Sequence, residues 1–307
     1  MSQAVSHAKK KSTLQQEGMG YRVFTVFNTI LLVIATVVTL YPMYYVVVAS
    51  ISEADELARN FGLLLFPLGK WNVFAYELVF RNGLVVSGFL NTFFILFVGL
   101  AFNMVLTCLG AYFLSLKGSM LVKPLSMLIL FTMYFSGGIV PIYMNVRDMG
   151  LMDSLWSLII PGAINTYNML IMRSAFAAVP DALYEAAYLD GAPHYKILSQ
   201  VYIPLCGATM AVMVLYYGVG HWNAWFNASL YISDTKKYPL QLVLRQILLL
   251  NQNSDLNASV TDLGELAKYS DMVKYALIVV SSAPILLLYP FLQRFFAKGV
   301  MVGALKG

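Results

Sequence analysis

Six stretches of this chain are long, apolar and free of Asp, Glu, Lys and Arg. A helix needs about 20 apolar residues to cross the hydrocarbon core of a bilayer, and uninterrupted stretches of this length favour that structure over any other. The chain is therefore predicted to be an all-α integral membrane protein with six transmembrane helices within residues 23–293. The charged residues that bound the stretches are Arg22 and Glu53, Arg81 and Lys117, Lys123 and Arg147, Asp153 and Arg173, Lys196 and Asp234 (with the span starting near Leu205), and Lys274 and Arg294.

Composition supports the same class. Of the 307 residues, 59% are hydrophobic and only 11% are charged, and the mean hydropathy is +0.70. Soluble domains carry roughly a quarter charged residues, so a soluble fold is excluded. The net charge of +5 suits the cytoplasmic flanks of a membrane protein. Nucleic-acid binding is not expected, because no basic patch with interleaved aromatic residues is present.

Six spans place both termini on one side of the membrane. The basic cluster Lys9, Lys10, Lys11 and Arg22 flanks the first span and should keep it on the cytoplasmic side. The tails 1–22 and 294–307 are then cytoplasmic, as is the connection 173–204. The long connections at roughly 50–85 and 231–273 face outward.

The residues that energy coupling or catalysis would require are missing from the sequence. The predicted spans contain no Asp, Glu, Lys or Arg, which argues against a proton relay. Gly69-Lys70 is followed by Trp71 instead of Ser or Thr, so no phosphate-binding loop is present. No hydrolase arrangement or metal site is indicated, and Cys108 and Cys206 suit small core positions. We expect a non-enzymatic membrane subunit whose energy comes from a separate protein.

The connection 173–204, here called the docking loop, contains the segment EAAYLDGAPHYKILSQVYIP from Glu185 to Pro204. Pro180 suits the start of a first helix, Gly191 suits the left-handed position that ends it, and Pro193 can open a second helix. Tyr195, Leu198 and Tyr202 are spaced to share one face of that second helix. Composition alone favours an ordinary cytoplasmic helical hairpin here.

The same segment resembles the EAA motif, E-A-A-x(3)-G-x(9)-I-x-L-P, of membrane subunits of bacterial binding-protein-dependent ABC importers. The spacing of Glu, Gly and Pro is intact, while Val201 and Ile203 replace the Ile and Leu of the motif. The resemblance implies a type I ABC importer permease fold with cytoplasmic EAA coupling helices that contact an ATPase subunit. The docking residues carried over are Glu185, Ala186, Ala187, Asp190, Gly191 and Pro204.

The resemblance covers most of the chain and is greatest to maltose-permease-type carbohydrate importers, in a branch serving oligosaccharides or polysaccharide fragments. Supporting stretches are Phe135 to Pro141, Trp222-Asn223, Lys237 to Leu240 and Lys298 to Val300. It implies a bacterial cytoplasmic (inner) membrane location, a homologous second permease, two ATP-binding subunits and an extracytoplasmic sugar-binding protein. ATP and Mg would bind to the ATPase, and this chain would bind no cofactor. The outer connection 231–273 would correspond to the scoop-like loop that contacts the binding protein.

Sugar sites combine aromatic platforms with neutral polar groups, and the fourth and fifth spans offer both. The predicted substrate-path residues are Asn165, Tyr167, Asn168, Tyr216, Tyr217, His221 and Trp222. Each also has an ordinary interpretation, because interfacial aromatics and interhelical hydrogen bonds are common in membrane proteins. Asn91 and Asn103 in the second span are expected to serve packing.

Two alternatives remain open, besides a membrane-embedded structural or assembly factor with no transport path, for which the sequence offers no positive sign. The same architecture could import another solute, such as phosphate, an amino acid or a polyamine. A gradient-driven secondary transporter or a channel would need no motor at all. The sequence specifies neither the sugar nor its length.

Overall fold

The computed structural model describes residues 19–60, 62–117, 120–253, 271–287 and 290. The predicted tails 1–22 and 294–307 lie almost entirely outside these residues, as does part of the outer connection 231–273. All of the regular secondary structure in the described part is helical, and that part contains no strand. Its elements are α1 (Met19–Ser50), α2 (Ala54–Arg59), α3 (Phe74–Arg81), α4 (Gly83–Ser115), α5 (Val122–Tyr134), α6 (Ile139–Asp148), η1 (Leu155–Leu158), α7 (Thr166–Ala177), α8 (Asp181–Leu189), α9 (His194–Ile197), η2 (Leu198–Tyr202), α10 (Ile203–Leu205), α11 (Gly207–Trp222), α12 (Phe226–Tyr231), η3 (Thr235–Lys237), α13 (Leu240–Asn253) and a last helix at 271–287.

Two helices among the described residues, α1 and α4, are long and apolar enough to cross a membrane by themselves. Two further spans are obtained if each bent pair counts as one: α5 with α6, bent by 115°, and the helix at His194–Leu205 with α11, bent by 89°. The all-helical class is confirmed, whereas the number of six spans stays a prediction.

Two of the predicted spans are interrupted where the local sequence cannot continue a helix. The third breaks at Gly138, which has φ +89° and whose backbone N–H donates to the Ser136 hydroxyl oxygen. In the fourth, helix α7 starts only at Thr166, after the short η1 turn and Pro161. The side chain of Asn165 accepts a hydrogen bond from the Asn168 N–H and caps α7 there.

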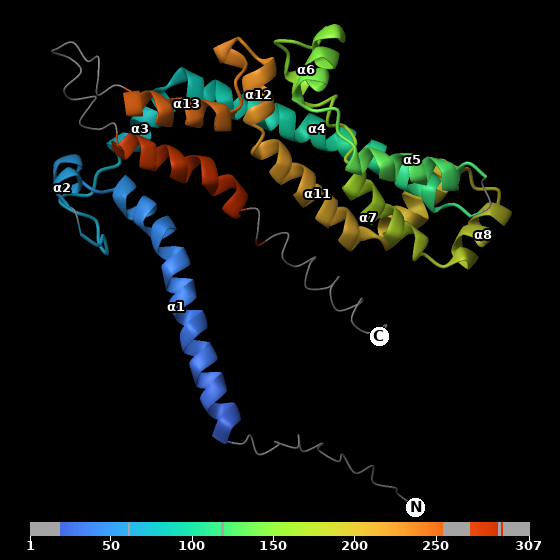
Figure 1. Cartoon of the computed structure of the whole chain (residues 1–307), viewed down its shortest axis with the longest axis horizontal. Helices are drawn as coiled ribbons and strands as arrows, with labels where there is room; N and C mark the ends of the chain where they lie inside the picture. Colours follow the sequence, from blue (N-terminus) through green and yellow to red (C-terminus); the bar gives the residue numbers. More distant parts are fainter. Residues whose placement is uncertain (1–18, 61, 118–119, 254–270, 288–289, 291–307) are drawn as a thin grey trace, which may run out of the picture.

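Helix α4 runs the length of the main body, from α3 and α13 at one end to α5 and α7 near the other (Figure 1). Its buried stripe repeats every three or four residues and carries small or polar side chains, which lets other helices approach closely. From Val85 to Cys108 its buried residues are Val85, Gly88, Thr92, Ile95, Gly99, Asn103, Thr107 and Cys108, and Ala111, Tyr112 and Leu114 are buried beyond them. At Gly88 an added Cβ would lie 3.2 Å from the Cα of Leu240, so α13 crosses α4 nearly backbone to backbone.

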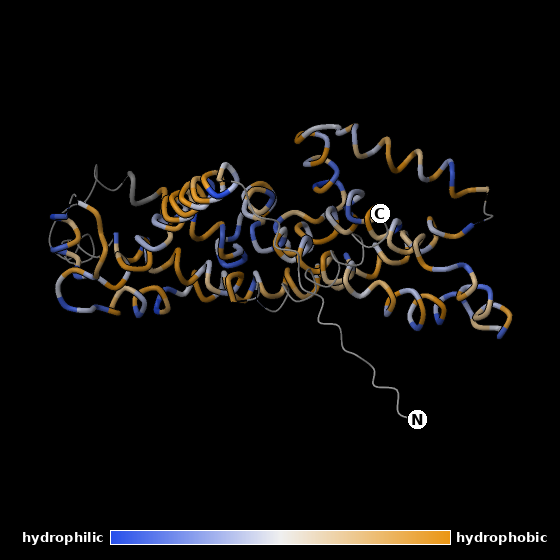
Figure 2. The backbone as a smooth tube through the Cα atoms, turned by 90° about the horizontal axis from the view of Figure 1, so that it is seen from below, coloured by the Kyte–Doolittle hydropathy of each residue, from blue (hydrophilic) through white to orange (hydrophobic). Residues whose placement is uncertain are grey.

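Helix α1 projects away from this body (Figure 1) and is apolar along most of its length (Figure 2). Only Val48, Ala49 and Ser50 at its end are buried. Its last turns meet the last helix, where the rings of Tyr45 and Tyr275 are 5.9 Å apart, edge to face. The remaining surface of α1 is available to lipid or to another protein.

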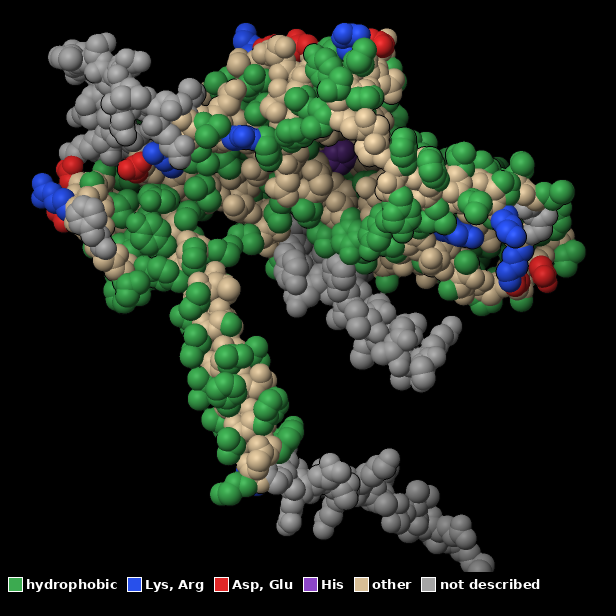
Figure 3. All heavy atoms as spheres, viewed as in Figure 1, with side chains coloured by type: hydrophobic (Ala, Val, Ile, Leu, Met, Phe, Trp, Pro, Cys, Tyr) green, Lys and Arg blue, Asp and Glu red, His purple; other side chains and the backbone are tan. Residues whose placement is uncertain are grey.

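Charged side chains gather over three regions of the face seen in Figure 3: around α2 and α3, around α6, and around α8. Between them the surface is mainly hydrophobic. The docking loop and the described part of the outer connection lie at opposite ends of the main body (Figure 1).

Candidate functional site

The docking loop folds as two helical segments joined by a tight turn. Gly191 has φ +72°, as predicted for the residue that ends the first helix. Its N–H donates to the Tyr188 carbonyl, and the N–H of Ala192 donates to the Ala187 carbonyl, both at 3.0 Å. These two bonds form a Schellman motif, which satisfies the last carbonyls of α8. A substituent on Gly191 would meet open space, so only the backbone conformation demands glycine.

The predicted docking residues lie mainly on the outside of this turn. Glu185, Ala186, Asp190, Gly191 and Pro204 are exposed, and Ala187 is half-buried. Helix α8 has no buried residue. The aromatic and apolar side chains beside them are unusually open to solvent, because Tyr188 is 61%, Leu189 85% and Tyr195 68% exposed.

The expectation for Tyr195 was wrong. Leu198 and Tyr202 are both buried, together with Ile197, whereas Tyr195, which was expected to share their face, is exposed. Tyr195 lies in α9, before the π-helix Leu198–Tyr202, and the wider turn of that π-helix changes the register between the two segments, so a regular helical spacing does not hold across them. Pro204 explains this, since it has no N–H to donate to the carbonyl four residues earlier.

The inner side of the docking loop is fastened to the ends of α4 and α7. The Tyr112 hydroxyl lies 3.0 Å from Nδ1 of His194, and Lys117 forms an exposed ion pair with Asp181. Nε of Arg173 on α7 donates to the Leu114 carbonyl at 3.0 Å. The rings of Phe176 and Tyr202 pack edge to face, 5.5 Å apart. These contacts join the docking loop to α4 and α7.

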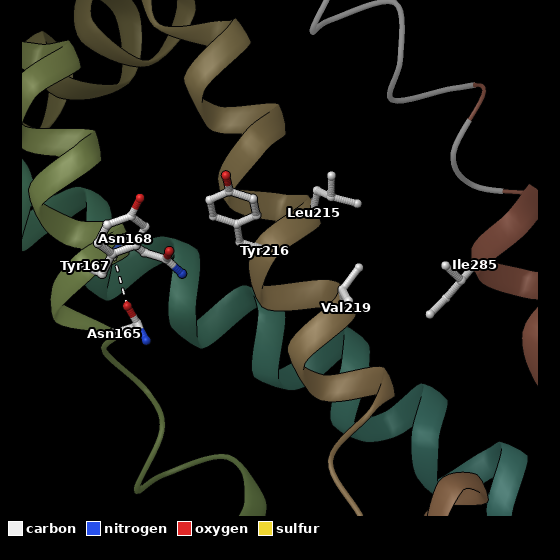
Figure 4. A pocket seen from close by; sticks show the side chains of 7 residues that line it. All are labelled: Asn165, Tyr167, Asn168, Leu215, Tyr216, Val219 and Ile285. Atoms are coloured by element: carbon white, nitrogen blue, oxygen red, sulfur yellow. Dashed lines mark hydrogen bonds between the residues drawn. The ribbon is translucent and has the colours of Figure 1, made fainter. Parts of the chain in front are cut away.

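A cavity of about 560 Å³ lies between α7, α11 and the last helix (Figure 4). Four of the seven predicted path residues line it together: Asn165, Tyr167, Asn168 and Tyr216. Leu215, Val219 and Ile285 complete its wall. The lining contains no charged group, and its tyrosines and asparagine amides are the polar partners a neutral, hydroxyl-rich ligand would need. Whether any of these side chains touches a substrate stays a prediction.

The other three predicted path residues, Tyr217, His221 and Trp222, are buried and do not line this cavity. Nε1 of Trp222 donates to the Ser281 carbonyl at 3.1 Å, joining α11 to the last helix. The Tyr217 hydroxyl lies 2.7 Å from Oγ1 of Thr107 and accepts the N–H of Asn165 at 3.1 Å. These side chains join helices within the body of the protein.

His221 belongs to a polar cluster centred on Asn103 of α4. Nδ2 of Asn103 donates to the carbonyls of Gly162 and Ala163 at 2.8 and 2.9 Å. Its Oδ1 lies 2.6 Å from Nε2 of His221, so Nε2 is the donor, because the amide nitrogen is already occupied. The cluster fastens α4, α11 and the segment before α7 to one another. It thereby fixes the start of α7, where Asn165 and Asn168 enter the cavity wall.

No protein-family model matches the chain. Its sequence is 34% identical over 290 residues to "Polygalacturonan/rhamnogalacturonan transport system permease protein YtcP" of Bacillus subtilis (strain 168), covering 94% of this chain and all of that protein. It is 38% identical over 290 residues to "Protein LplC" of the same organism, covering 93% and 96%. The fold matches a chain of a bacterial ABC transporter involved in the import of the acidic polysaccharide alginate, with a TM-score of 0.82, 30% identity, and coverage of 91% and 98%.

The chain belongs to the permease subunits of carbohydrate ABC importers. The expected resemblance is thereby confirmed, and with it the sugar-import class. As a member of this family the permease is a non-catalytic membrane component, and the tyrosine- and asparagine-lined cavity is consistent with that role.

The sequence predicted the docking loop and four residues of the cavity wall. It did not predict the residues that hold the helices around the cavity together. Gly99 and Thr107 were not singled out, although Gly99 leaves the room that His221 occupies. Asn91 and Asn103 were assigned to packing, and both do bond between elements: Nδ2 of Asn91 donates to the carbonyls of Lys236 and Tyr238. The signal for Gly99 and Thr107 was their place in the three-to-four-residue stripe along α4.

Proposed function

We propose that this permease forms the translocation path of an ATP-driven importer that takes up fragments of an acidic polysaccharide. Its partners would be a homologous second permease, two ATP-binding subunits and an extracytoplasmic sugar-binding protein. ATP and Mg would bind in the ATPase subunits only. The complex would sit in the bacterial cytoplasmic membrane with both termini of this chain inside.

The cargo is proposed from two comparisons. One relative is named for polygalacturonan and rhamnogalacturonan, and the matched transporter imports alginate. Polygalacturonan and alginate are both built of uronic acids, whose sugar rings carry a carboxylate. A fragment of such a polymer combines hydroxyl-rich surfaces, which suit the cavity of Figure 4, with a negative charge at each uronic acid unit.

The proposed mechanism is alternating access driven through the docking loop. The observation that supports it is that the docking loop has two different sides: its outer side is exposed, and its inner side is bonded to the rest of the protein. Glu185 is exposed, and its carboxylate has no partner among the described residues. On the inner side, His194 contacts Tyr112 of α4, and Asp181 forms an ion pair with Lys117, just after the end of α4. A partner that grips the exposed side would transmit its closing motion to α4 and α7, and so to the cavity wall.

The test compares two glycines that share the same backbone conformation. Gly191 and Gly150 have φ +72° and +69°, and a side chain on either would meet open space. Leucine therefore strains both turns to a similar degree, by about 1–2 kcal/mol. Only Gly191 lies in the docking loop.

With the complete importer produced in cells, Gly191→Leu should reach the membrane in normal amount and abolish oligosaccharide uptake and cargo-stimulated ATP hydrolysis. Gly150→Leu should keep both. Normal uptake by Gly191→Leu would refute the docking role. Equal losses in both variants would assign the effect to backbone strain alone.

A further inference from the structure

A second cavity, of about 440 Å³, lies on the outer-connection end of the permease between Trp225 and α13. Trp225 precedes α12, and the two helices are neighbours in the fold (Figure 1). Its lining is Trp225, Gln241, Leu244, Arg245, Leu248 and Leu249. Unlike the cavity of Figure 4, it has a positively charged side chain, that of Arg245, in its wall.

The cavity is formed by a face of α13 that the core leaves free. Leu240 and Val243 are buried against α4 and the last helix. Gln241, Arg245 and Leu248 follow one another at spacings of four and three residues, so they share another side of the helix. This side forms the wall of the cavity, opposite the Trp225 ring.

Arg245 is held in a defined orientation by that ring. Its guanidinium carbon lies 3.7 Å from the centroid of Trp225, which is a close cation–π contact. A stacked guanidinium keeps the N–H groups on its edge available, and these match the two oxygens of a carboxylate. Arg245 itself is exposed, so the edge can be reached from outside.

The cation also lacks an acidic partner among the described residues, although several other cations of the chain have one. Arg81, Arg147, Lys237 and Lys274 each form an ion pair with an acidic residue of this chain. The structure gives Arg245 no hydrogen bond and no carboxylate partner among the described residues. Within the described residues its charge therefore has no acidic partner, and it lies at the wall of a cavity that also offers the Gln241 amide.

We propose that Arg245, oriented by Trp225, forms with Gln241 a subsite for the carboxylate of a uronic acid unit as the cargo enters from the outer side. The inference rests on the proposed function, because it names the group of the cargo that this end of the permease recognises. The sugar ring would lie over the apolar floor formed by Leu244 and Leu248. Acidic fragments would be favoured here, and neutral ones would pass on to the uncharged cavity without this contact.

The experiment uses the complete importer with its binding protein in excess, and two probes: trigalacturonate and its neutral methyl ester. Arg245→Gln should slow trigalacturonate uptake about 10- to 100-fold, the factor expected for losing charge-assisted hydrogen bonds. Uptake of the methyl ester should not change. Arg245→Lys should recover only part of the rate, because an ammonium neither stacks as a plane nor binds two oxygens side by side. Lys236→Gln, an exposed cation nearby that does not line the cavity, is the matched charge control.

Four outcomes would overturn the subsite. Unchanged trigalacturonate uptake by Arg245→Gln would do so while leaving the importer function intact. A similar loss in Lys236→Gln would point to general electrostatics. If Arg245→Gln slows both probes equally and also lowers the ATPase stimulation given by unloaded binding protein, the residue contacts that protein instead. If the wild type imports neutral sugars but neither uronate probe, the acidic cargo and the subsite both fail, and no sugar uptake at all would refute the proposed function itself.

Discussion

Gly99 provides the room in α4 for the imidazole of His221, and replacing it with alanine should destabilise the permease. The added methyl carbon would lie 2.6 Å from Nε2, 2.8 Å from Cε1 and 3.2 Å from Cδ2 of the ring. The ring cannot simply turn aside, because Nε2 is bonded to Oδ1 of Asn103 at 2.6 Å. Either α4 and α11 must separate, or the hydrogen bond must break.

The cost follows from these two routes. Overpacking a well-packed interior costs about 1–3 kcal/mol. Turning the ring away leaves a buried donor or acceptor unpaired, at about 1–3 kcal/mol. Alanine recovers roughly 1 kcal/mol over glycine in a helix interior. Since only one of the two routes is needed, the net expectation is a loss of about 0–2 kcal/mol in the free energy of unfolding relative to the wild type, and of about 1–3 kcal/mol relative to a glycine-to-alanine change that meets no clash.

The measurement is a denaturant titration of purified variants in mixed micelles. Gly218→Ala on α11 is the matched control, since its methyl carbon would lie 3.7 Å from Cδ1 of Leu96, an ordinary contact. It should be neutral or slightly stabilising. In a His221→Ala background the ring is gone, and Gly99→Ala should then cost little. The reasoning is refuted if Gly99→Ala is as stable as Gly218→Ala, or if its cost is the same with and without the imidazole.

Two smaller perturbations test the turn at Asp153 and the cap of α7. The backbone N–H of Asp234 first, and then Lys237, hold the pKa of Asp153 below its ordinary value. The stabilisation is therefore present at neutral pH and is lost as pH falls through the lowered pKa, so the deficit in thermal midpoint of Asp153→Ala should shrink in acid. Asn165→Ala removes the side-chain acceptor for the Asn168 N–H and should cost about 0.5–2 kcal/mol, seen as faster amide exchange in the first turn of α7. An unchanged exchange rate would contradict the cap assignment.

Local chemistry was the part of the structure that the sequence could predict. The turn at Gly191 followed from one residue's tolerance of positive φ, and the helical class followed from apolar, charge-free stretches. Hydropathy shows that a stretch is apolar, but it does not show whether the helix within that stretch is straight, bent or broken. The bend at Gly138 and the late start of α7 at Thr166 therefore went unpredicted, although Gly137-Gly138 and Pro161 stand at these places.

The cavity shows the same limit at the level of single residues. Tyr216 and Tyr217 are neighbours in sequence and were given the same role, yet side chains one residue apart on a helix point about 100° from each other. Tyr216 faces the cavity and Tyr217 bonds Thr107 of α4. Only the position of the surrounding helices decides which of the two is available to a ligand, and composition cannot supply it.

The contacts divide the cavity wall into two parts that are held differently. Asn165, Tyr167 and Asn168 begin α7, which is joined to α4 by the Asn103 cluster at one point and by the bond of Arg173 to Leu114 at another. Those two points on α4 are about 16 Å apart along its axis, at 1.5 Å per residue, so the helix holds them as one body. Ile285 on the opposite side belongs to the last helix, which also packs against the end of α1. The last helix is also joined to α11 by the bond of Trp222 to the Ser281 carbonyl. If the docking loop is pulled as proposed, the polar wall should move as a unit with α4, and the Trp222–Ser281 bond is the contact that decides whether Ile285 follows it.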